Sequence, residues 1–336
     1  MNASLERLYR REDLEPVELE SLFAQLIAGK LDPVLLTALL VTLKVKGERG
    51  SEIAAAARAL RAAARPFPRP DYLFADTCGT GGDGKCTLNV SSGAALVAAA
   101  CGLPVAKHGN RSVSSRSGSA DVFTALGVNV QADAVLARRC LDEAGICFLH
   151  APEYHPGIAH AMPVRRALAT RTLFNLLGPL VNPAAPPCQL AGVYAPEFIP
   201  PLAEAFAALD VSHALVVHGG GLDEIALHAV TQAARISNGE IEYIELTPEA
   251  AGLEFQPVEE LAGGSPQHNA EALHAMLAGN GPRAYRDAVA LNTGALLWTA
   301  ELVPDLRAGT QTALAAIADG RAAGVLERLR TISHGA

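Results

Sequence analysis

The sequence predicts an α/β protein in which a small helical unit precedes a larger unit built on a mostly parallel central sheet. Three observations support this prediction. Apolar residues first recur at helical spacing, the proline-rich stretch RPFPRP then interrupts the pattern at residues 65–70, and short apolar runs alternate with helical stretches beyond it. With 336 residues the chain can bury a large core, and two domains are its simplest division.

The first unit is predicted to contain three helices. Apolar residues recur at helical spacing over residues 17–27. Asp32 and Pro33 then supply a cap and a first-turn proline for a second helix, which ends near Gly47. An alanine-rich run after Ser51 forms the third helix.

The second unit is predicted to alternate strands and helices. Strands are expected over residues 73–77, 103–109, 145–151, 189–194 and 213–219, and helices over residues 91–102 and 117–127. The proline-rich segment 166–187 is expected to be an irregular connection between the two units. Because parallel sheets bind ligands at the carboxyl ends of their strands, the loops after these strands are the candidate site.

Composition narrows the class of protein. Half of the residues are apolar, 18% are charged, and the net charge of −8 offers no general attraction for nucleic acid or an anionic membrane. The six cysteines form no C-x-x-C pair, so we expect reduced thiols. No signal-like segment or membrane-length apolar run is present, and a cytoplasmic location is expected.

The stretch ADTCGTGGDGKCTLNVSS, residues 75–92, fits two phosphate-binding patterns. The dinucleotide pattern needs an acid at the end of the next strand, where Lys107 and His108 stand instead. The triphosphate-loop pattern conflicts with Asp83, and Cys86 replaces its magnesium-binding hydroxyl. A glycine-rich turn that favours an anion remains, with a turn that holds no ligand as the alternative.

The residues from Gly84 to Ala120 include no Asp or Glu. Lys85, Lys107, Arg111 and Arg116 are positive there, and the run SVSSRSGS supplies five serines. If loops from two successive strand ends open on one edge of the sheet, two anion sites lie side by side. A doubly phosphorylated sugar fits such a pair of sites, and a solvated serine loop is the alternative.

Other charged residues complete the candidate site. Asp223 and Glu224 follow a strand end, where a carboxylate pair can hold magnesium together with substrate phosphates. Arg165, Arg166 and Arg171 offer forks for a carboxylate, and position alone does not choose among them.

Five motifs together resemble the anthranilate phosphoribosyltransferase family, whose members join anthranilate to phosphoribosyl pyrophosphate (PRPP). They are GTGGD at residues 79–83, NVSS at 89–92, KHGNRSVSSRSGSADV at 107–122, EYHPGIAHAMPVRRALATRTLFNLLGPLVNPA at 153–184 and GLDE at 221–224. The resemblance implies a fold of the nucleoside phosphorylase and class II phosphoribosyltransferase type. It places residues 1–70, with about 166–187, in a helical domain for dimerisation and anthranilate, and residues 71–165 and 188–336 in an α/β domain for PRPP and magnesium.

The resemblance also assigns site residues. PRPP would contact Gly79, Gly82, Asp83, Thr87, Asn89, Val90, Ser91, Ser92, Lys107, His108, Gly109, Asn110, Arg111, Ser112, Val113, Ser114, Ser115 and Ser119. Anthranilate would contact Gly79, Asn110 and Arg165, which selects one of the three arginines. Magnesium, two ions per monomer, would be held by Ser91, Asp223 and Glu224, and the catalytic candidates are Lys107, Asp83 and His108.

The family implies a homodimer, and the net charge of −8 leads us to expect no nucleic-acid or membrane partner. Two positions depart from its pattern: Ser92 replaces the usual Thr, and Gly220 stands where a more polar residue is expected. Two alternatives remain. One is an enzyme like the pyrimidine nucleoside phosphorylases, which also break a bond at the anomeric carbon; the other is a non-catalytic relative that binds nucleic acid.

Overall fold

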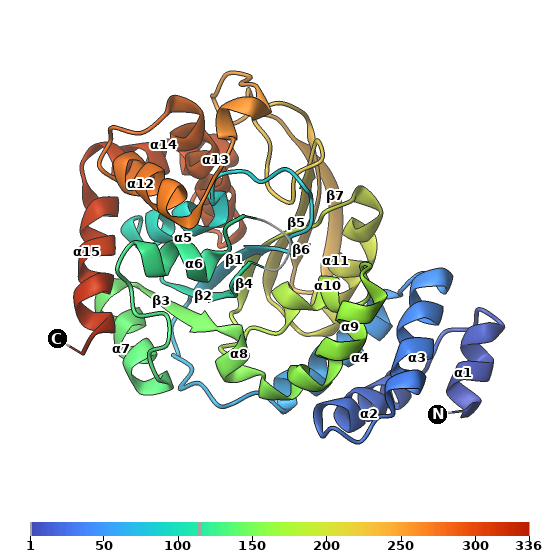
Figure 1. Cartoon of the computed structure of the whole chain (residues 1–336). Coiled ribbons are helices and arrows are strands. Elements are labelled where there is room, and N and C mark those ends of the chain that lie inside the picture. Colours follow the sequence, from blue (N-terminus) through green and yellow to red (C-terminus); the bar gives the residue numbers. More distant parts are fainter. Residues whose placement is uncertain (1, 113–115, 336) are drawn as a thin grey trace.

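A seven-stranded sheet forms the centre of the molecule in the computed structural model, which describes residues 2–112 and 116–335 (Figure 1). The strand order is β3-β2-β1-β4-β5-β6-β7. The strands are β1 (Ala75–Gly79), β2 (Val105–Gly109), β3 (Ile146–His150), β4 (Cys188–Gly192), β5 (His213–Gly219), β6 (Thr231–Ser237) and β7 (Glu240–Leu246). The first five are parallel and the last two antiparallel, so the mostly parallel sheet is confirmed.

Helices cover both faces of the sheet. On one face α5 (Val90–Ala100) packs against β1 and β2, and α13 (Arg283–Thr299) packs against β4 and β5. The other helices of this unit are α6 (Ser119–Ala125), α7 (Ala134–Ala144), α12 (Pro266–Leu277), α14 (Leu306–Ala318) and α15 (Arg321–Ser333). On the opposite face α11 (Ile199–Ala208) packs against β5 and β6.

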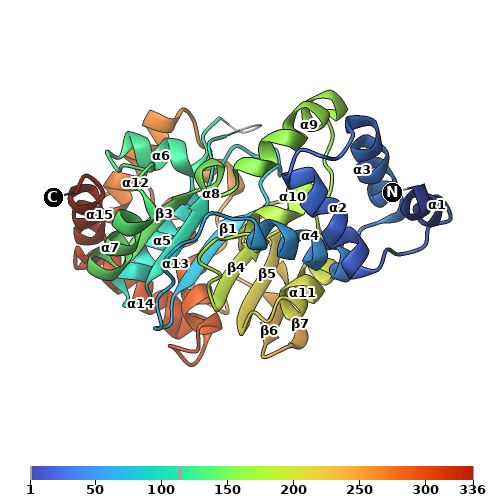
Figure 2. The same cartoon turned by 90° about the horizontal axis from the view of Figure 1, so that it is seen from below.

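The helical unit lies to one side of the sheet, at the opposite end of the molecule from the C-terminal helices (Figures 1 and 2). It contains α1 (Asn2–Tyr9), α2 (Pro16–Ile27), α3 (Pro33–Lys46) and α4 (Gly50–Ala62). The predicted start of the second helix is confirmed, because Asp32 caps α3 by accepting hydrogen bonds from the Val34 and Leu35 N–H groups.

A later stretch of chain packs with the helical unit. It contains α8 (Ala151–Tyr154), a 3₁₀ helix (Pro156–Ala161), α9 (Met162–Leu168), α10 (Phe174–Leu177) and a second 3₁₀ turn (Gly178–Leu180). The expected irregularity of segment 166–187 is only partly right, because residues 181–187 form no helix or strand whereas residues 174–180 are helical. Its apolar residues, among them Leu173 and Leu176, are buried in one core with α2, α3 and α4, and that burial orders the segment despite its prolines.

Alternate residues of β5 face two different cores. Leu215 and Val217 point to the face covered by α5 and α13, whereas Ala214 and Val216 share a core with α11 and the helical unit. The sheet therefore reads as continuous apolar runs, which is the pattern that predicted the parallel strands. It also anchors the helical unit to the strands that carry the candidate site.

Two further predictions from composition can be compared with the structure. All six cysteines are free thiols. Over residues 2–112 and 116–335, no helix is both long enough and apolar enough to cross a membrane.

Candidate active site

A segment that carries two carboxylates crosses the ends of three neighbouring strands, each of which ends in glycine. The strand-end residues are Gly79 of β1, Gly192 of β4 and Gly219 of β5. A Cβ on Gly192 would lie 1.6 Å from the backbone O of Asp223, and one on Gly79 would lie 2.0 Å from Asp223 Oδ2. A Cβ on Gly219 would lie 2.4 Å from the backbone O of Glu224. Only glycines allow the Asp223–Glu224 segment to lie this close to the sheet.

The same segment is fixed from the opposite side by Asn292 of α13, which is fully buried. Asn292 Oδ1 accepts from the Ile225 N–H at 3.0 Å, and Asn292 Nδ2 donates to the Ile225 O at 3.1 Å. The Ala226 N–H donates to Thr231 Oγ1 at 3.0 Å. Asp223 and Glu224 are therefore held by a rigid backbone and are not on a free loop.

Gly220 has a local explanation. Its φ of +56° lies in the left-handed region, and a Cβ there would lie 2.5 Å from Ala229 Cβ. A polar side chain at this position would need a different turn.

The glycine-rich loop after β1 presents free donors. Gly81, Gly82 and Gly84 have positive φ, and the Gly81 N–H donates to Asp223 Oδ2 at 2.6 Å. Within the described residues, the N–H groups of Gly82, Asp83 and Gly84 have no hydrogen-bond partner. Consecutive unpaired N–H groups in such a turn form a concavity that binds an anion.

The far end of this loop is fixed to the segment that precedes α12. The Leu88 N–H donates to the Leu261 O, and the Gly263 N–H donates to the Cys86 O, both at 2.8 Å. Thr87 lies between these two bonds and Asn89 follows them, both half-buried. The loop is thus held at both ends while its donors stay free.

Asp223 and Glu224 are acids in an unfavourable environment. Burial raises the pKa of both carboxyls, and repulsion from Asp83 on Asp223 and from Asp223 on Glu224 raises them further. Glu224 Oε1 accepts from the Ser91 N–H at 3.2 Å, and no Lys, Arg or His nitrogen of the described chain lies within ion-pair distance of either acid. A bound cation would offset the burial of these carboxylates and the repulsion between them, so the pair fits a metal ion.

The identity of such a metal follows from its available ligands. No group of three or more His, Cys, Asp or Glu side chains in the described residues is arranged to hold a metal ion by itself. The two carboxylates and the Ser91 hydroxyl offer oxygen only, and ligand oxygens must complete the coordination. Magnesium binds in this manner, through one or two carboxylates plus substrate phosphates.

Lys107 of β2 supplies a buried positive charge under this site. Its side chain is 1% exposed, and its Nζ donates to the Thr77 O at 2.6 Å and to Ser91 Oγ at 3.5 Å. On the adjacent strand, burial raises the pKa of Asp76 to about 6, while Lys107 and a hydrogen bond from Asn182 lower it. Lys107 therefore interacts electrostatically with Asp76 and donates a hydrogen bond to the Ser91 hydroxyl.

His108 follows Lys107 and is also buried. Its Nδ1 lies 3.4 Å from the Gly178 O, and its Nε2 has no partner in the described chain. Burial and the nearby His155, whose ring centroid is 5.5 Å away, lower the pKa of His108 to about 3. The imidazole is therefore neutral at physiological pH, and its role as a base stays a prediction.

The serine-rich loop follows β2, so it opens on the same sheet edge as the glycine loop. Asp121 Oδ2 accepts from the Ser112 and Gly118 N–H groups, each at 3.0 Å, and Asp121 Oδ1 accepts from Arg111 Nη1 at 3.1 Å. Asn89 Nδ2 donates to the Ser117 O at 3.4 Å and so joins the two loops.

Not every predicted contact residue can be placed in this site. Val113, Ser114 and Ser115 lie outside the described residues. The backbone O of Asn110 accepts from Ser119 Oγ at 3.5 Å, and Gly109 is the last residue of β2. Val90 and Ser92 are buried in the first turn of α5, and the Ser92 side chain is fully covered.

The three arginines have different surroundings. Arg165 of α9 is half-buried, its guanidinium lies 5.0 Å from the Phe174 ring centroid, and burial lowers its pKa. Arg165 has no carboxylate partner among the described residues, so its guanidinium N–H groups can donate hydrogen bonds to the carboxylate of a ligand. Arg166 is exposed, and Arg171 donates to the Gly82 O.

Four residues that shape the site were not singled out from the sequence. Asp76 had a signal, because it is an acid within an otherwise apolar strand. Asp121 immediately follows the acid-free stretch at the start of a predicted helix. Asn182 and Asn292 carry no local signal, because their partners lie far away in sequence.

Comparisons with known proteins agree with this geometry. Residues 71–323 match the family described as "Glycosyl transferase family, a/b domain", and residues 3–64 match "Glycosyl transferase family, helical bundle domain". An anthranilate phosphoribosyltransferase of Sorangium cellulosum is 55% identical, covering 99% of this chain and 96% of that protein. One from Aeromonas hydrophila is 53% identical, covering 99% and 98%.

Solved structures are also similar. The anthranilate phosphoribosyltransferase of Thermus thermophilus has a TM-score of 0.93 and 43% identity, covering 98% of this chain and 99% of that chain. The Saccharomyces cerevisiae enzyme in complex with PRPP and Mg has a TM-score of 0.89 and 27% identity, covering 100% and 99%. The same yeast protein has been solved in complex with 4-fluoroanthranilate.

The strand-end glycines give a test of the carboxylate site. We expect Gly192→Ala to displace Asp223, because the new Cβ would overlap its backbone, and to weaken magnesium binding in the presence of pyrophosphate by about tenfold or more. Isothermal titration calorimetry measures this affinity. The matched control is Gly324→Ala in α15, where a Cβ meets only Arg328 Nη1 at 3.5 Å and should leave the affinity unchanged. Equal affinities in the two variants would contradict the dependence on Gly192.

Proposed function

The chain belongs to the anthranilate phosphoribosyltransferase family, and we propose that it transfers the phosphoribosyl group of PRPP to the amine of anthranilate, releasing pyrophosphate. The observation that carries this proposal is the meeting of three features at one sheet edge. These are a loop with unpaired N–H donors, a loop rich in serines, and a carboxylate pair without a cation.

The phosphorylated substrate would contact the two loops. Gly79, Gly82, Asp83, Thr87, Asn89, Val90, Ser91, Ser92, Lys107–Ser115 and Ser119 are the proposed PRPP-binding residues. The free N–H groups at Gly82–Gly84 suit the pyrophosphate end. Val90 and Ser92 would contribute backbone atoms, because their side chains are buried.

Magnesium would be held by Asp223, Glu224 and the Ser91 hydroxyl, and we propose two ions per monomer. When bound, magnesium supplies Lewis-acid stabilisation of negative charge on the pyrophosphate. Asp83 lies near Asp223 at the edge of the same loop, where it can contact the metal-bound substrate.

Catalysis would depend on charge stabilisation. Anthranilate's aromatic amine is neutral near pH 7, so the difficult step is breaking the bond between pyrophosphate and the sugar carbon. Lys107 and the N–H groups of the glycine loop stabilise the negative charge that develops on the pyrophosphate. His108, as a neutral imidazole, can accept the amine proton after attack, or it forms a wall of the substrate pocket.

Anthranilate would lie beside Arg165, with Gly79 and Asn110 on the side of the sugar. An arginine fork binds a carboxylate with two parallel hydrogen bonds. Arg165 is half-buried and has no acid partner in the described chain. An ion pair between Arg165 and the carboxylate of bound anthranilate is therefore favourable.

The remaining proposals concern organisation. We propose that residues 1–70 with about 166–187 act as the dimerisation and anthranilate domain, and that residues 71–165 and 188–336 bind PRPP. A homodimer is supported by the exposed apolar side chains Val34, Val41 and Val45, which lie along one side of α3. A cytoplasmic location stays a prediction.

A single assay tests the proposed function. Purified protein is mixed with anthranilate, PRPP and magnesium chloride, and we expect anthranilate fluorescence to fall. Omitting PRPP, or adding a chelator of magnesium, should abolish the change. Persistent fluorescence in the complete mixture, with phosphorolysis of thymidine in a parallel sample, would support a nucleoside phosphorylase instead.

Lys107→Met tests the charge under the metal site. It keeps the aliphatic stem and removes the ammonium group, so we expect kcat to fall about a hundredfold. Steady-state kinetics measures kcat, and urea unfolding shows whether the variant is folded. Because Asp76 would lose its neighbouring cation, the double variant Lys107→Met/Asp76→Asn controls for stability and should recover stability without activity. A kcat within threefold of the wild type would refute this role.

Arg165→Ala tests the carboxylate contact. We expect the KM for anthranilate to rise about ten- to a hundredfold, the usual value of a charged hydrogen bond, while the KM for PRPP stays within about twofold. Arg165→Lys keeps the charge without the fork and should give an intermediate value. Unchanged KM for anthranilate in Arg165→Ala would show that another residue holds the carboxylate.

A further inference from the structure

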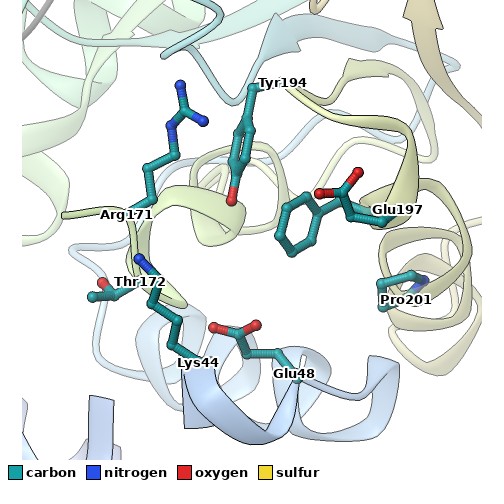
Figure 3. A pocket seen from close by; sticks show the side chains of 9 residues that line it. Lys44, Glu48, Arg171, Thr172, Tyr194, Glu197 and Pro201 are labelled. Atoms are coloured by element: carbon teal, nitrogen blue, oxygen red, sulfur yellow. The ribbon is translucent and has the colours of Figure 1, made fainter. Parts of the chain in front are cut away.

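Arg171 connects the glycine loop to the rest of the molecule. It lies in the short connection between α9 and α10. Its Nη2 donates a hydrogen bond to the backbone O of Gly82. Its guanidinium lies 4.2 Å from the ring centroid of Tyr194. Figure 3 shows Arg171 beside Tyr194. No carboxylate of the described chain pairs with Arg171. Its two contacts are therefore with Gly82, in the glycine loop, and with Tyr194.

Tyr194 is a fixed platform for this guanidinium. Its N–H donates to Thr80 Oγ1 at 3.2 Å, and its ring lies 4.8 Å from the ring centroid of Phe198. Burial raises the pKa of Tyr194 to about 12, so the ring stays neutral at working pH. Arg171 therefore makes a cation–π contact with Tyr194, and Tyr194 is hydrogen-bonded to Thr80 of the glycine loop.

The contact with Gly82 sets the direction of a donor. The peptide between Gly82 and Asp83 is planar and trans, so its C=O and N–H point in opposite directions. Since the Gly82 O faces Arg171, the Asp83 N–H must face away from it. That N–H is one of the three loop donors without a partner in the described residues. Gly82 has a φ of +82° and no Cβ, so its backbone has few steric restraints, and the contact with Arg171 restrains the orientation of this peptide.

The connection that carries Arg171 is itself held in place. The Thr172 N–H donates to Asn175 Oδ1 at 3.0 Å, and the Asn175 N–H donates to the Thr172 O at 2.8 Å. Lys44 at the end of α3 donates to Thr170 Oγ1. A cavity of about 310 Å³ lies beside the connection, lined by Lys44, Glu48, Arg171, Tyr194, Glu197 and Phe198 (Figure 3).

We propose that Arg171 is a positioning residue for the pyrophosphate-binding loop. It holds the Gly82–Asp83 peptide so that the Asp83 N–H stays aimed at the anion, and it ties this loop to the helical unit through the connection beside Lys44. This inference rests on the proposed function in one respect, namely that the loop binds the pyrophosphate end of PRPP. Arg171 acts through Gly82 and touches no reacting atom.

Arg171→Met tests this inference. We expect the KM for PRPP, and the dissociation constant of magnesium pyrophosphate measured by calorimetry, each to rise about tenfold, as for loss of a charged hydrogen bond. The KM for anthranilate should stay within about twofold, and the unfolding midpoint in urea should not change, because Arg171 is exposed. A residue with a merely structural role would affect both substrates together.

Matched variants complete the experiment. Arg166→Met changes an exposed neighbour and should leave all constants unchanged. Tyr194→Leu removes the platform and should raise the KM for PRPP in the same direction, whereas Tyr194→Phe keeps the ring and should not. Arg171→Met/Tyr194→Leu should be no worse than Arg171→Met alone. If Arg171→Met does not fold, Tyr194→Leu tests the same contact.

Two outcomes would overturn the inference. One is an unchanged pyrophosphate affinity in Arg171→Met, and the other is an equal rise of both KM values. Failure of the proposed function is distinguishable, because a wild-type protein that does not consume anthranilate can still be titrated with magnesium pyrophosphate.

Discussion

The close approach of the Asp223–Glu224 backbone to three strand-end glycines is the constraint on which the site depends. β1, β4 and β5 are neighbours in the sheet, and any side chain at their last residues would overlap this segment. The two carboxylates are thereby held beside the glycine loop, and no Lys, Arg or His nitrogen of the described chain lies within ion-pair distance of them, although Lys107 is near enough to lower the pKa of Glu224. Burial makes their charged forms costly, and a metal ion bound to a polyanionic substrate removes that cost. The site is therefore complete only with its ligands.

Negative and positive side chains alternate from the sheet to the metal site. Asp76 lies within β1, Lys107 lies on the adjacent strand β2, and Ser91 contacts both Lys107 and Glu224. Lys107 lowers the pKa of both Asp76 and Glu224, so it reduces the electrostatic cost of burying these two carboxylates. The unpaired N–H groups of the glycine loop add partial positive charge without a side chain. A leaving pyrophosphate thus meets donors that need no rearrangement during the reaction.

Local patterns in the sequence predicted the parts of the fold that are locally encoded. The apolar runs predicted β1 to β5, the Asp32-Pro33 pair predicted the start of α3, and the acid-free stretch predicted two loops on one edge. The antiparallel strands β6 and β7 were not predicted, although the β7 sequence EIEYIEL combines Ile and Tyr with acids, a composition that suits a partly exposed edge strand. Contacts between distant residues, such as Asn292 with Ile225 and Arg171 with Gly82, cannot be read from spacing, because the fold alone brings them together.

The connection around α9 and α10 explains how two different substrates can be aligned. It follows strands of the α/β unit in sequence, yet its apolar residues are buried in the core of the helical unit. Arg165, proposed to hold the carboxylate of anthranilate, lies in α9, and Arg171, proposed to hold the pyrophosphate loop, lies between α9 and α10. A rigid segment that fixes both groups also fixes the distance between the amine and the sugar carbon. Such alignment contributes to catalysis by lowering the entropy that the encounter of two substrates would otherwise lose.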